Sequence, residues 1–94
     1  MTLEAAVKKH TKAVLDSLGA YYFFPATGGF GRSGVPDIVG CYKGRFFAIE
    51  CKAGKGKTTA LQEREMGKIN DTGGIAFVVS EHNIEEVARC LNGF

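Results

Sequence analysis

The sequence is poor in several features that would place a chain in a specialised class. Its three cysteines, Cys41, Cys51 and Cys90, are odd in number and show no Cys-x-x-Cys spacing, which argues against a disulfide scaffold or a zinc site. All three lie in apolar patterns, so we expect buried, reduced thiols. No apolar stretch approaches the roughly 18 residues of a membrane span, and no N-terminal apolar run precedes a small-residue cleavage site. We therefore expect a soluble, cytoplasmic protein.

Net charge is small as well. Twelve Lys and Arg residues oppose ten Asp and Glu residues, and the resulting charge of +2 does not by itself indicate a nucleic-acid partner. The sequence shows no internal repeat, low-complexity tract or linker-bounded second unit. Because 94 residues leave room for one small core, we predict a single domain over residues 1–94. Domains of this size are often stabilised by self-association, and we expect a homodimer.

Hydrophobic spacing predicts three helices. The first covers residues 2–18, with Thr2 as its N-cap and Gly19 at its end. The second covers about 58–72, and the third covers about 81–91 with Ser80 as its N-cap. The inward stripe of the first helix is expected to be Leu3, Val7, Val14 and Leu18, flanked by Ala6 and Leu15.

Four strand-like segments lie between these helices, at residues 20–24, 35–42, 45–52 and 75–80. Pro25 ends the first segment or places it near a sheet edge. Segment 45–52 is apolar on both faces, which is typical of a central strand. A helix connects it to segment 75–80, so these two strands should be parallel. The elements predict an α/β fold in the order α-β-β-β-α-β-α, with a mixed four-stranded sheet flanked by helices.

A predicted chain reversal at Lys43-Gly44 brings charged groups together. In an antiparallel hairpin centred on this reversal, Asp37 lies directly opposite Glu50. Side chains alternate along a strand, so Lys52 projects on the same face as Glu50. Two carboxylates and an ammonium group should therefore converge at the end of a buried strand.

Charges at such a position need partners. A divalent cation would relieve the repulsion, because Mg2+ binds one or two carboxylates together with substrate phosphate. The ion would polarise a phosphoryl oxygen and lower the pKa of a water molecule, while Lys52 would stabilise charge on the phosphate or orient the attacking water. These parts suit phosphodiester hydrolysis. The alternative is a salt-bridged strand pair on a solvated face.

Pro36-Asp37 followed by Glu50-Cys51-Lys52 resembles the PD-(D/E)xK nuclease superfamily. The wider segment 31–40 is similar to the virus-type replication-repair nuclease (VRR-NUC) domain. Segment 58–62, the helix that runs to Gly73-Gly74 and the strand that follows agree with this pattern, so the resemblance extends from Glu4 to about residue 80.

This resemblance implies a restriction-endonuclease-like fold and a Mg2+- or Mn2+-dependent DNA endonuclease. It implies Asp37 and Glu50 as metal ligands, the main-chain carbonyl of Cys51 as a further ligand, and Lys52 as the catalytic lysine. Cys51 stands where an aliphatic residue is usual, and a small apolar thiol is compatible with that position. Stand-alone members look like phage or prophage proteins of the host cytoplasm. The resemblance favours branched DNA such as four-way junctions, whose symmetry a two-fold dimer would match.

Two residues have two interpretations each. Glu4 is either a surface acid suited to a helix start and paired with Lys8, or the first-helix acid that reaches the metal site in many nucleases of the resembled superfamily. Gln62 is either a capping residue or, as the resemblance implies, an active-site amide that orients water, Lys52 or phosphate.

Basic groups near the predicted site could hold the phosphates of a nucleic acid, whereas Lys9 and Lys12 are interpreted as solvated surface. The glycine-rich segment 26–34 lacks the ending of a phosphate-binding P-loop, and we interpret it as a loop over the active site rather than a plain connector. The leading hypothesis is a DNA endonuclease. The alternatives are a non-catalytic DNA-binding or assembly module with the same fold and, third, an RNA-directed nuclease. The candidate phosphate-binding residues are Lys8, Arg32, Ser33, Lys55 and Lys57.

Overall fold

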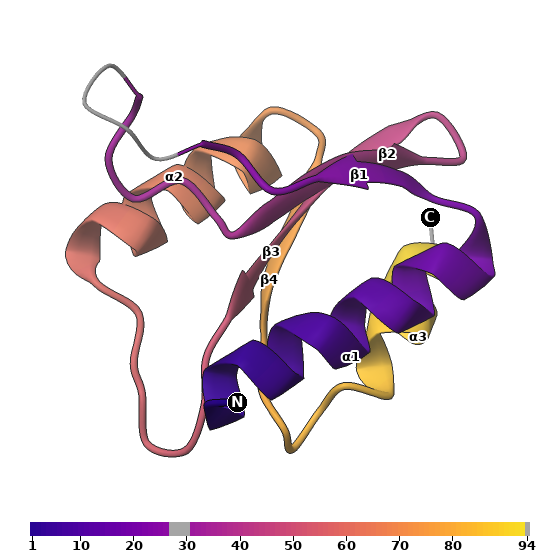
Figure 1. The fold of residues 1–94 in the computed structure, drawn as a ribbon. Helices are drawn as coiled ribbons and strands as arrows, with labels where there is room; N and C mark the ends of the chain where they lie inside the picture. The colour runs from indigo at the N-terminus through magenta and orange to yellow at the C-terminus, as the bar shows by residue number, and fades with distance from the viewer. Residues whose placement is uncertain (27–30, 94) are drawn as a thin grey trace.

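Seven elements follow one another along the part of the chain that the computed structural model describes, residues 1–26 and 31–93 (Figure 1). Their order, α-β-β-β-α-β-α, confirms the predicted order. Residues 27–30 of the predicted glycine-rich loop lie outside the described residues. The elements are α1 (Leu3–Leu18), β1 (Tyr21–Phe23), β2 (Ile38–Tyr42), β3 (Arg45–Cys51), α2 (Ala60–Asp71), β4 (Ile75–Val79) and α3 (Glu86–Asn92).

The four strands form one mixed sheet in the order β1-β2-β3-β4. The pairs β1–β2 and β2–β3 are antiparallel, and β3 and β4 are parallel. The prediction of a central strand at residues 45–52, parallel to the strand after the second helix, is therefore confirmed. The short β1 lies at the sheet edge, where Pro25 follows it.

The hairpin between β2 and β3 has the register that the sequence predicts. Lys43 and Gly44 both have positive φ angles, 52° and 79°, as in the tight two-residue turns that suit the twist of a hairpin. Ile38 pairs with Ile49, so the residues that follow in register are Asp37 and Glu50. β2 begins at Ile38, and Asp37 lies directly before it rather than within it.

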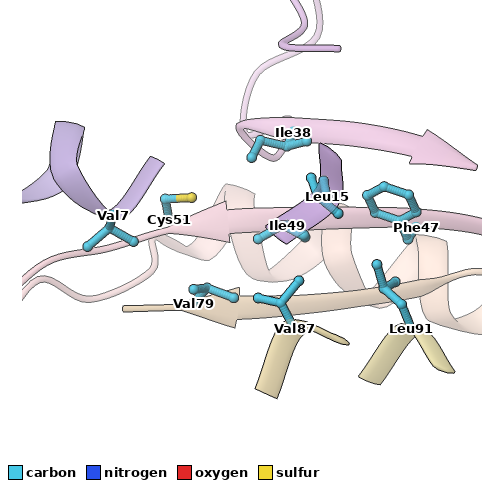
Figure 2. Packing of buried hydrophobic residues seen from close by; sticks show 9 residues of the cluster. All are labelled: Val7, Leu15, Ile38, Phe47, Ile49, Cys51, Val79, Val87 and Leu91. Carbon is cyan, nitrogen blue, oxygen red and sulfur yellow. The ribbon is translucent and has the colours of Figure 1, made fainter. Parts of the chain in front are cut away.

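Helices cover both faces of the sheet. Figure 1 shows α1 and α3 together on one face and α2 on the other. The main core lies between the sheet and the pair α1 and α3, and Figure 2 shows its buried side chains. Alternation along β3 sends Phe47, Ile49 and Cys51 into this core and turns Glu50 toward α2. The core cluster is Val7, Leu15, Ile38, Phe47, Ile49, Cys51, Val79, Val87 and Leu91.

Helix α1 has the predicted ends but a different buried stripe. Thr2 Oγ1 accepts a hydrogen bond from Ala5 N over 3.1 Å, which confirms the N-cap. The fully buried positions are Val7, Thr11 and Leu15, spaced by four residues, whereas Leu3 is 52% exposed. Burial of Thr11 is tolerated because its hydroxyl donates to the Val7 carbonyl over 2.8 Å. The predicted stripe was therefore wrong at the first turn.

The last helix is shorter than predicted, and Ser80 does not cap it. Residues 81–85 form turns, and α3 begins at Glu86. The side chain of Asn83 accepts from Ser80 N over 2.7 Å and donates to the Val78 carbonyl over 3.1 Å. The Asn83 side chain thus ties this turn to the end of β4, and the helix begins only after residues 81–85.

Burial of the cysteines is uneven. Cys51 is buried and Cys90 is partly buried, but Cys41 is exposed, so the expectation of three buried thiols was wrong for Cys41. Cys41 pairs with Phe46 on the face where α2 lies, and both residues are exposed there. All three thiols are free. Among the described helices, none has the length and apolar character needed to cross a membrane.

Candidate active site

The candidate site lies where β3 ends, beside the beginning of β2, with α1 and α2 each contributing side chains. The ribbon of Figure 1 shows the N-terminal end of α1 near this end of β3. The structure brings together the four residues that the sequence predicts as catalytic: Asp37, Glu50, Lys52 and Gln62.

Glu50 is the most enclosed acid of the site, at 3% exposure. Its Oε2 accepts a hydrogen bond from Gln62 Nε2 over 3.0 Å and lies 3.3 Å from Lys52 Nζ. Its Oε1 is buried and has no hydrogen-bond partner. Burial, and then the charge of Asp37, raise the pKa of Glu50 above its ordinary value, against the opposing effect of Lys52. The carboxylate is thus held by one oxygen, while the other is buried without a hydrogen-bond partner.

Asp37 is held at the edge of the same site. Its Oδ2 accepts a hydrogen bond from the main-chain N–H of Cys51 over 2.9 Å. Its Oδ1 lies 3.8 Å from Lys8 Nζ, which is also 3.7 Å from Glu4 Oε2. Helix α1 therefore brings one acid and one base to the Asp37 side of the site.

The proline of Pro36-Asp37 has a physical consequence for Cys51. In the β2–β3 register, residue 36 is the next position opposite Cys51. Within an antiparallel ladder, the N–H and C=O of one residue point toward the same neighbouring strand. Pro36 has no N–H to donate to the Cys51 carbonyl, and the Cys51 N–H binds the Asp37 side chain instead. Pro36 therefore cannot supply a main-chain donor to the Cys51 carbonyl.

Gln62 makes both of the contacts between which the sequence left a choice. Its Oε1 accepts from Thr59 N over 2.9 Å, and the Thr59 hydroxyl accepts from Gln62 N over 3.1 Å, which completes a capping box at the start of α2. Its Nε2 donates to Glu50. The helix cap and the contact with the acid are therefore parts of one arrangement.

Arg32 lies in an ion pair that sequence reasoning did not predict. Its Nε and Nη2 donate to the two carboxylate oxygens of Glu65 over 2.9 and 2.8 Å. The Arg32 side chain remains 73% exposed, whereas that of Glu65 is 10% exposed. Arg32 lowers the pKa of Glu65 through these hydrogen bonds. Glu65 directly precedes Met66 in α2, and an acid buried at this position requires a partner. The sequence did not indicate that this partner is Arg32.

The remaining predicted phosphate-binding residues lie around this site. Ser33 is exposed in the segment that precedes Pro36. Lys55 and Lys57 are exposed in the segment that follows β3. That segment is fixed by Gly54 N, which donates to the Glu81 carboxylate over 2.9 and 3.1 Å. Both lysines therefore project from the tethered segment that follows β3.

The donor set fits a hard divalent cation. Within residues 1–26 and 31–93, no group of three or more His, Cys, Asp or Glu side chains could hold a metal ion. Mg2+ does not need such a group, because it keeps several waters and binds through one or two carboxylates and substrate phosphate. Asp37, and Glu50 with its unpartnered Oε1, supply carboxylate oxygens of that kind.

Comparison with known proteins gives a consistent result. The family model described as archaeal Holliday junction resolvase (Hjc) matches residues 11–87, a range that includes Asp37, Glu50, Lys52 and Gln62. A protein named "Putative nuclease p44", from Acyrthosiphon pisum secondary endosymbiont phage 1, is 29% identical over 92 residues, which cover 95% of each chain.

Two solved structures are similar to the whole or most of the chain. A structure described as a VRR_NUC domain is 26% identical, with a TM-score of 0.78 over 100% of this chain and 99% of that one. The Holliday junction resolvase Hjc of Archaeoglobus fulgidus is 21% identical, with a TM-score of 0.61 over 81% of this chain and 66% of that one, a likeness of fold alone. The chain belongs to the archaeal Holliday junction resolvase (Hjc) family and is a nuclease of the VRR-NUC type with a restriction-endonuclease-like fold.

Proposed function

We propose that the chain is a Mg2+- or Mn2+-dependent DNA endonuclease that hydrolyses phosphodiester bonds in branched DNA such as four-way junctions. The observation that carries the metal dependence is Glu50, whose Oε1 is buried without a partner while the Asp37 charge acts on the same carboxylate. Leaving a buried charged oxygen unpaired is costly, and a bound cation would remove that cost.

Asp37 and Glu50 would hold the ion, with the Cys51 carbonyl as a third oxygen donor and Glu4 as a further acid from α1. An ion bound there would polarise a phosphoryl oxygen and promote ionisation of an attacking water. Glu4 lies on the Asp37 side of the site through Lys8, which contacts both acids. Its role as a ligand is part of this proposal.

Lys52 and Gln62 act on the same carboxylate from two directions. The Lys52 ammonium, 3.3 Å from Glu50 Oε2, is available to neutralise charge that develops on the phosphate in the transition state. Gln62 fixes the orientation of Glu50 through a hydrogen bond whose donor is itself held by the capping box. Because both groups are positioned before substrate arrives, they stabilise developing charge with little reorganisation.

Exposed basic and polar groups would bind the DNA backbone around these acids. Lys55 and Lys57 follow β3, Ser33 precedes Pro36, and Lys8 lies on α1 beside Asp37. Arg32 retains a largely exposed side chain within its ion pair and can offer its remaining N–H donors to phosphate. Such contacts give affinity without sequence preference, which suits recognition of a DNA shape.

We also propose that two copies act together on the substrate in the cytoplasm of the host cell. A four-way junction has two equivalent strands to cut, and a two-fold dimer would present two matching sites. Large apolar side chains are exposed on or beside the edge strand β1, at Tyr21, Phe23 and Phe24. Sedimentation analysis over a range of concentrations tests this point, and a monomer at every concentration, with and without junction DNA, would exclude the dimer.

The central experiment measures cleavage of matched substrates that share one sequence. A labelled four-way junction, linear duplex DNA, single-stranded DNA and the corresponding duplex RNA are incubated with Mg2+, Mn2+, Ca2+ or EDTA. Cleavage of the junction with Mg2+ or Mn2+ that EDTA abolishes is the expected result. Preferential cleavage of RNA would instead support an RNA-directed nuclease.

Asp37→Asn is the matched variant for this experiment. Asn retains an oxygen that can accept from Cys51 N, so the fold and junction binding should persist while cleavage is lost. Junction binding without cleavage by the wild-type chain, at any enzyme concentration and with any of the metals, would instead favour a non-catalytic binding module.

A further inference from the structure

We propose that Lys8 is a positioning residue which occupies the Asp37 side of the site as a resident counter-ion and leaves it when a divalent ion binds, so that the ammonium becomes available to a DNA phosphate. This inference rests on the proposed function. It assigns Lys8 a second role, in metal binding, beyond that of a residue on a DNA-binding surface.

The first observation is the position of the ammonium between two acids. Lys8 Nζ lies 3.7 Å from Glu4 Oε2 and 3.8 Å from Asp37 Oδ1. Glu4 and Lys8 are four residues apart on one face of α1, and Asp37 comes from the segment directly before β2. The side chains are partly enclosed, with 35% exposure for Lys8 and 25% for Asp37, so the charges are less screened than on open surface. Without a metal, Lys8 relieves the repulsion between the two carboxylates.

The second observation is that Asp37 has one oxygen already in use. Its Oδ2 is held by the Cys51 N–H, and its Oδ1 faces Lys8. A cation that binds Asp37 through Oδ1 therefore takes the place of the ammonium or lies beside it, where like charges repel. Metal binding and the Lys8–Asp37 contact should then oppose one another.

The third observation separates Lys8 from Lys52. Lys52 contacts Glu50 Oε2, an oxygen that Gln62 also binds, while Glu50 Oε1 stays free for a ligand. Lys52 can thus remain in place when the site is filled, whereas Lys8 cannot keep its contact with Asp37 Oδ1. Its flexible four-carbon side chain allows the ammonium to move away without movement of α1.

The test compares Mn2+ affinity and DNA affinity in Lys8→Met and in the control Lys9→Met. Both substitutions remove one positive charge from neighbouring positions of α1, but Lys9 is exposed and only Lys8 contacts the two acids. Binding of Mn2+ is measured without DNA from the electron paramagnetic resonance signal of the free ion. Binding of a four-way junction is measured in Ca2+ over a range of salt concentrations.

Lys8→Met is expected to bind Mn2+ about tenfold more tightly than the wild type, in the range usual for coupled sites, and Lys9→Met within about twofold. The same variant should bind the junction more weakly. The slope of log affinity against log salt concentration should also become shallower by about the contribution of one phosphate contact. Lys8→Arg should retain the wild-type Mn2+ affinity more closely than Lys8→Met, because it retains the positive charge. Opposite changes in metal and DNA affinity would not arise from a merely structural role.

Equal Mn2+ affinity in Lys8→Met and Lys9→Met would overturn the inference while leaving the metal-dependent nuclease intact. Weaker Mn2+ binding in Lys8→Met would also overturn it, since Lys8 would then support the ion. If the wild-type chain binds no Mn2+ at all, the proposed function itself fails, and the inference fails with it. Circular dichroism checks the fold, and Lys8→Gln replaces Lys8→Met if the latter does not fold.

Discussion

Gln62 Nε2 donates a hydrogen bond to Glu50 Oε2 over 3.0 Å while the other end of the same amide caps helix α2. The amide can serve both because its oxygen and nitrogen have opposite hydrogen-bonding roles. An acid that sits at the end of a buried strand is thereby oriented by the start of the next helix. The stability of the helix start and the orientation of the acid are linked through one side chain.

Gln62→Glu should separate these two roles. Glutamate at this position still completes a capping box, because its carboxylate accepts from Thr59 N. It cannot donate to Glu50 and instead places a second negative charge beside it. We expect the helix cap to persist, a loss of stability near neutral pH from the repulsion between the two carboxylates, and a decrease in cleavage rate of about 10- to 100-fold, as for other residues that orient a metal ligand. Single-turnover cleavage and thermal unfolding, measured on the same preparation, check this prediction.

Thr59→Ala is the complementary control. It removes the hydroxyl that accepts from Gln62 N and leaves the contact between Gln62 and Glu50 possible. Loss of an N-cap hydroxyl costs about 1 kcal/mol of stability, so the melting temperature should fall while most activity remains. If both variants lose activity equally, the cap and not the contact with Glu50 carries the effect.

Glu50→Gln should stabilise the protein as it inactivates it. The raised pKa means that the folded chain holds a proton on Glu50 more tightly than the unfolded chain does. This contribution to stability is fully present below the ordinary glutamate pKa and is lost as pH rises through that value to the raised one. A neutral amide cannot ionise, so Glu50→Gln does not lose this stability as pH rises. We therefore expect its free energy of unfolding to exceed that of the wild type by about 1 kcal/mol near neutral pH and by less in mild acid.

Urea unfolding of wild type and Glu50→Gln at about pH 4.5, close to the ordinary glutamate pKa, and at about pH 7.5, roughly three units above it, measures this difference. Glu85→Gln, at an exposed position in the turns before α3, controls for the loss of one surface charge. A stability gain in Glu50→Gln that is the same at both pH values would show that the charge of Glu50 is not the cause.

The hairpin and its site illustrate what a single sequence can predict. The Lys43-Gly44 turn sets the register from two local residues, and alternation along β3 then places Glu50 and Lys52 on one face. These relationships are short in sequence and follow from backbone geometry alone. The capping box at Thr59 and Gln62 is local in the same way.

Other contacts could not be predicted because they join distant segments. Arg32 and Glu65 are 33 residues apart, and neither the pattern of the loop nor that of α2 specifies the other partner. The contact of Lys8 with Asp37 likewise joins α1 to the segment before β2, two parts of the chain that no local pattern relates. The error at α3 lies in residues 81–85, which form turns, while the Asn83 side chain binds Ser80 N and Val78 O before them.

Arg32→Gln should destabilise the protein in a pH-dependent manner. Arg32 lowers the folded-state pKa of Glu65, so the stability that this pair contributes is present above the ordinary glutamate pKa and is lost as pH falls through the lowered value. The decrease in the free energy of unfolding of Arg32→Gln, relative to the wild type, should therefore be largest near neutral pH and become smaller in acid. Arg64→Gln is the control, since Arg64 acts on Glu65 only through its charge. Unfolding curves from neutral to acidic pH test the prediction. A loss of unfolding free energy that is the same at every pH would contradict it.

Gly34→Ala should be the most damaging substitution in the segment that leads to Asp37. Gly34 has φ +78°, and an added Cβ would lie 2.6 Å from the main-chain carbon and oxygen of Leu61 at the start of α2. The left-handed conformation alone costs an alanine about 1–2 kcal/mol, and the overlap with main chain adds to this, so we expect a loss of at least about 2 kcal/mol. Gly44→Ala is the matched control, because Gly44 has φ +79° and no atom within 4 Å of the added Cβ.

Relief of the overlap in Gly34→Ala requires either the segment before Pro36 or the start of α2 to move, and these two segments carry Asp37 and Gln62. Cleavage should therefore fall in Gly34→Ala and persist in Gly44→Ala, measured below the melting temperature of each variant. Equal stability and equal activity in the two variants would show that the close approach of Gly34 to Leu61 has no part in positioning the site.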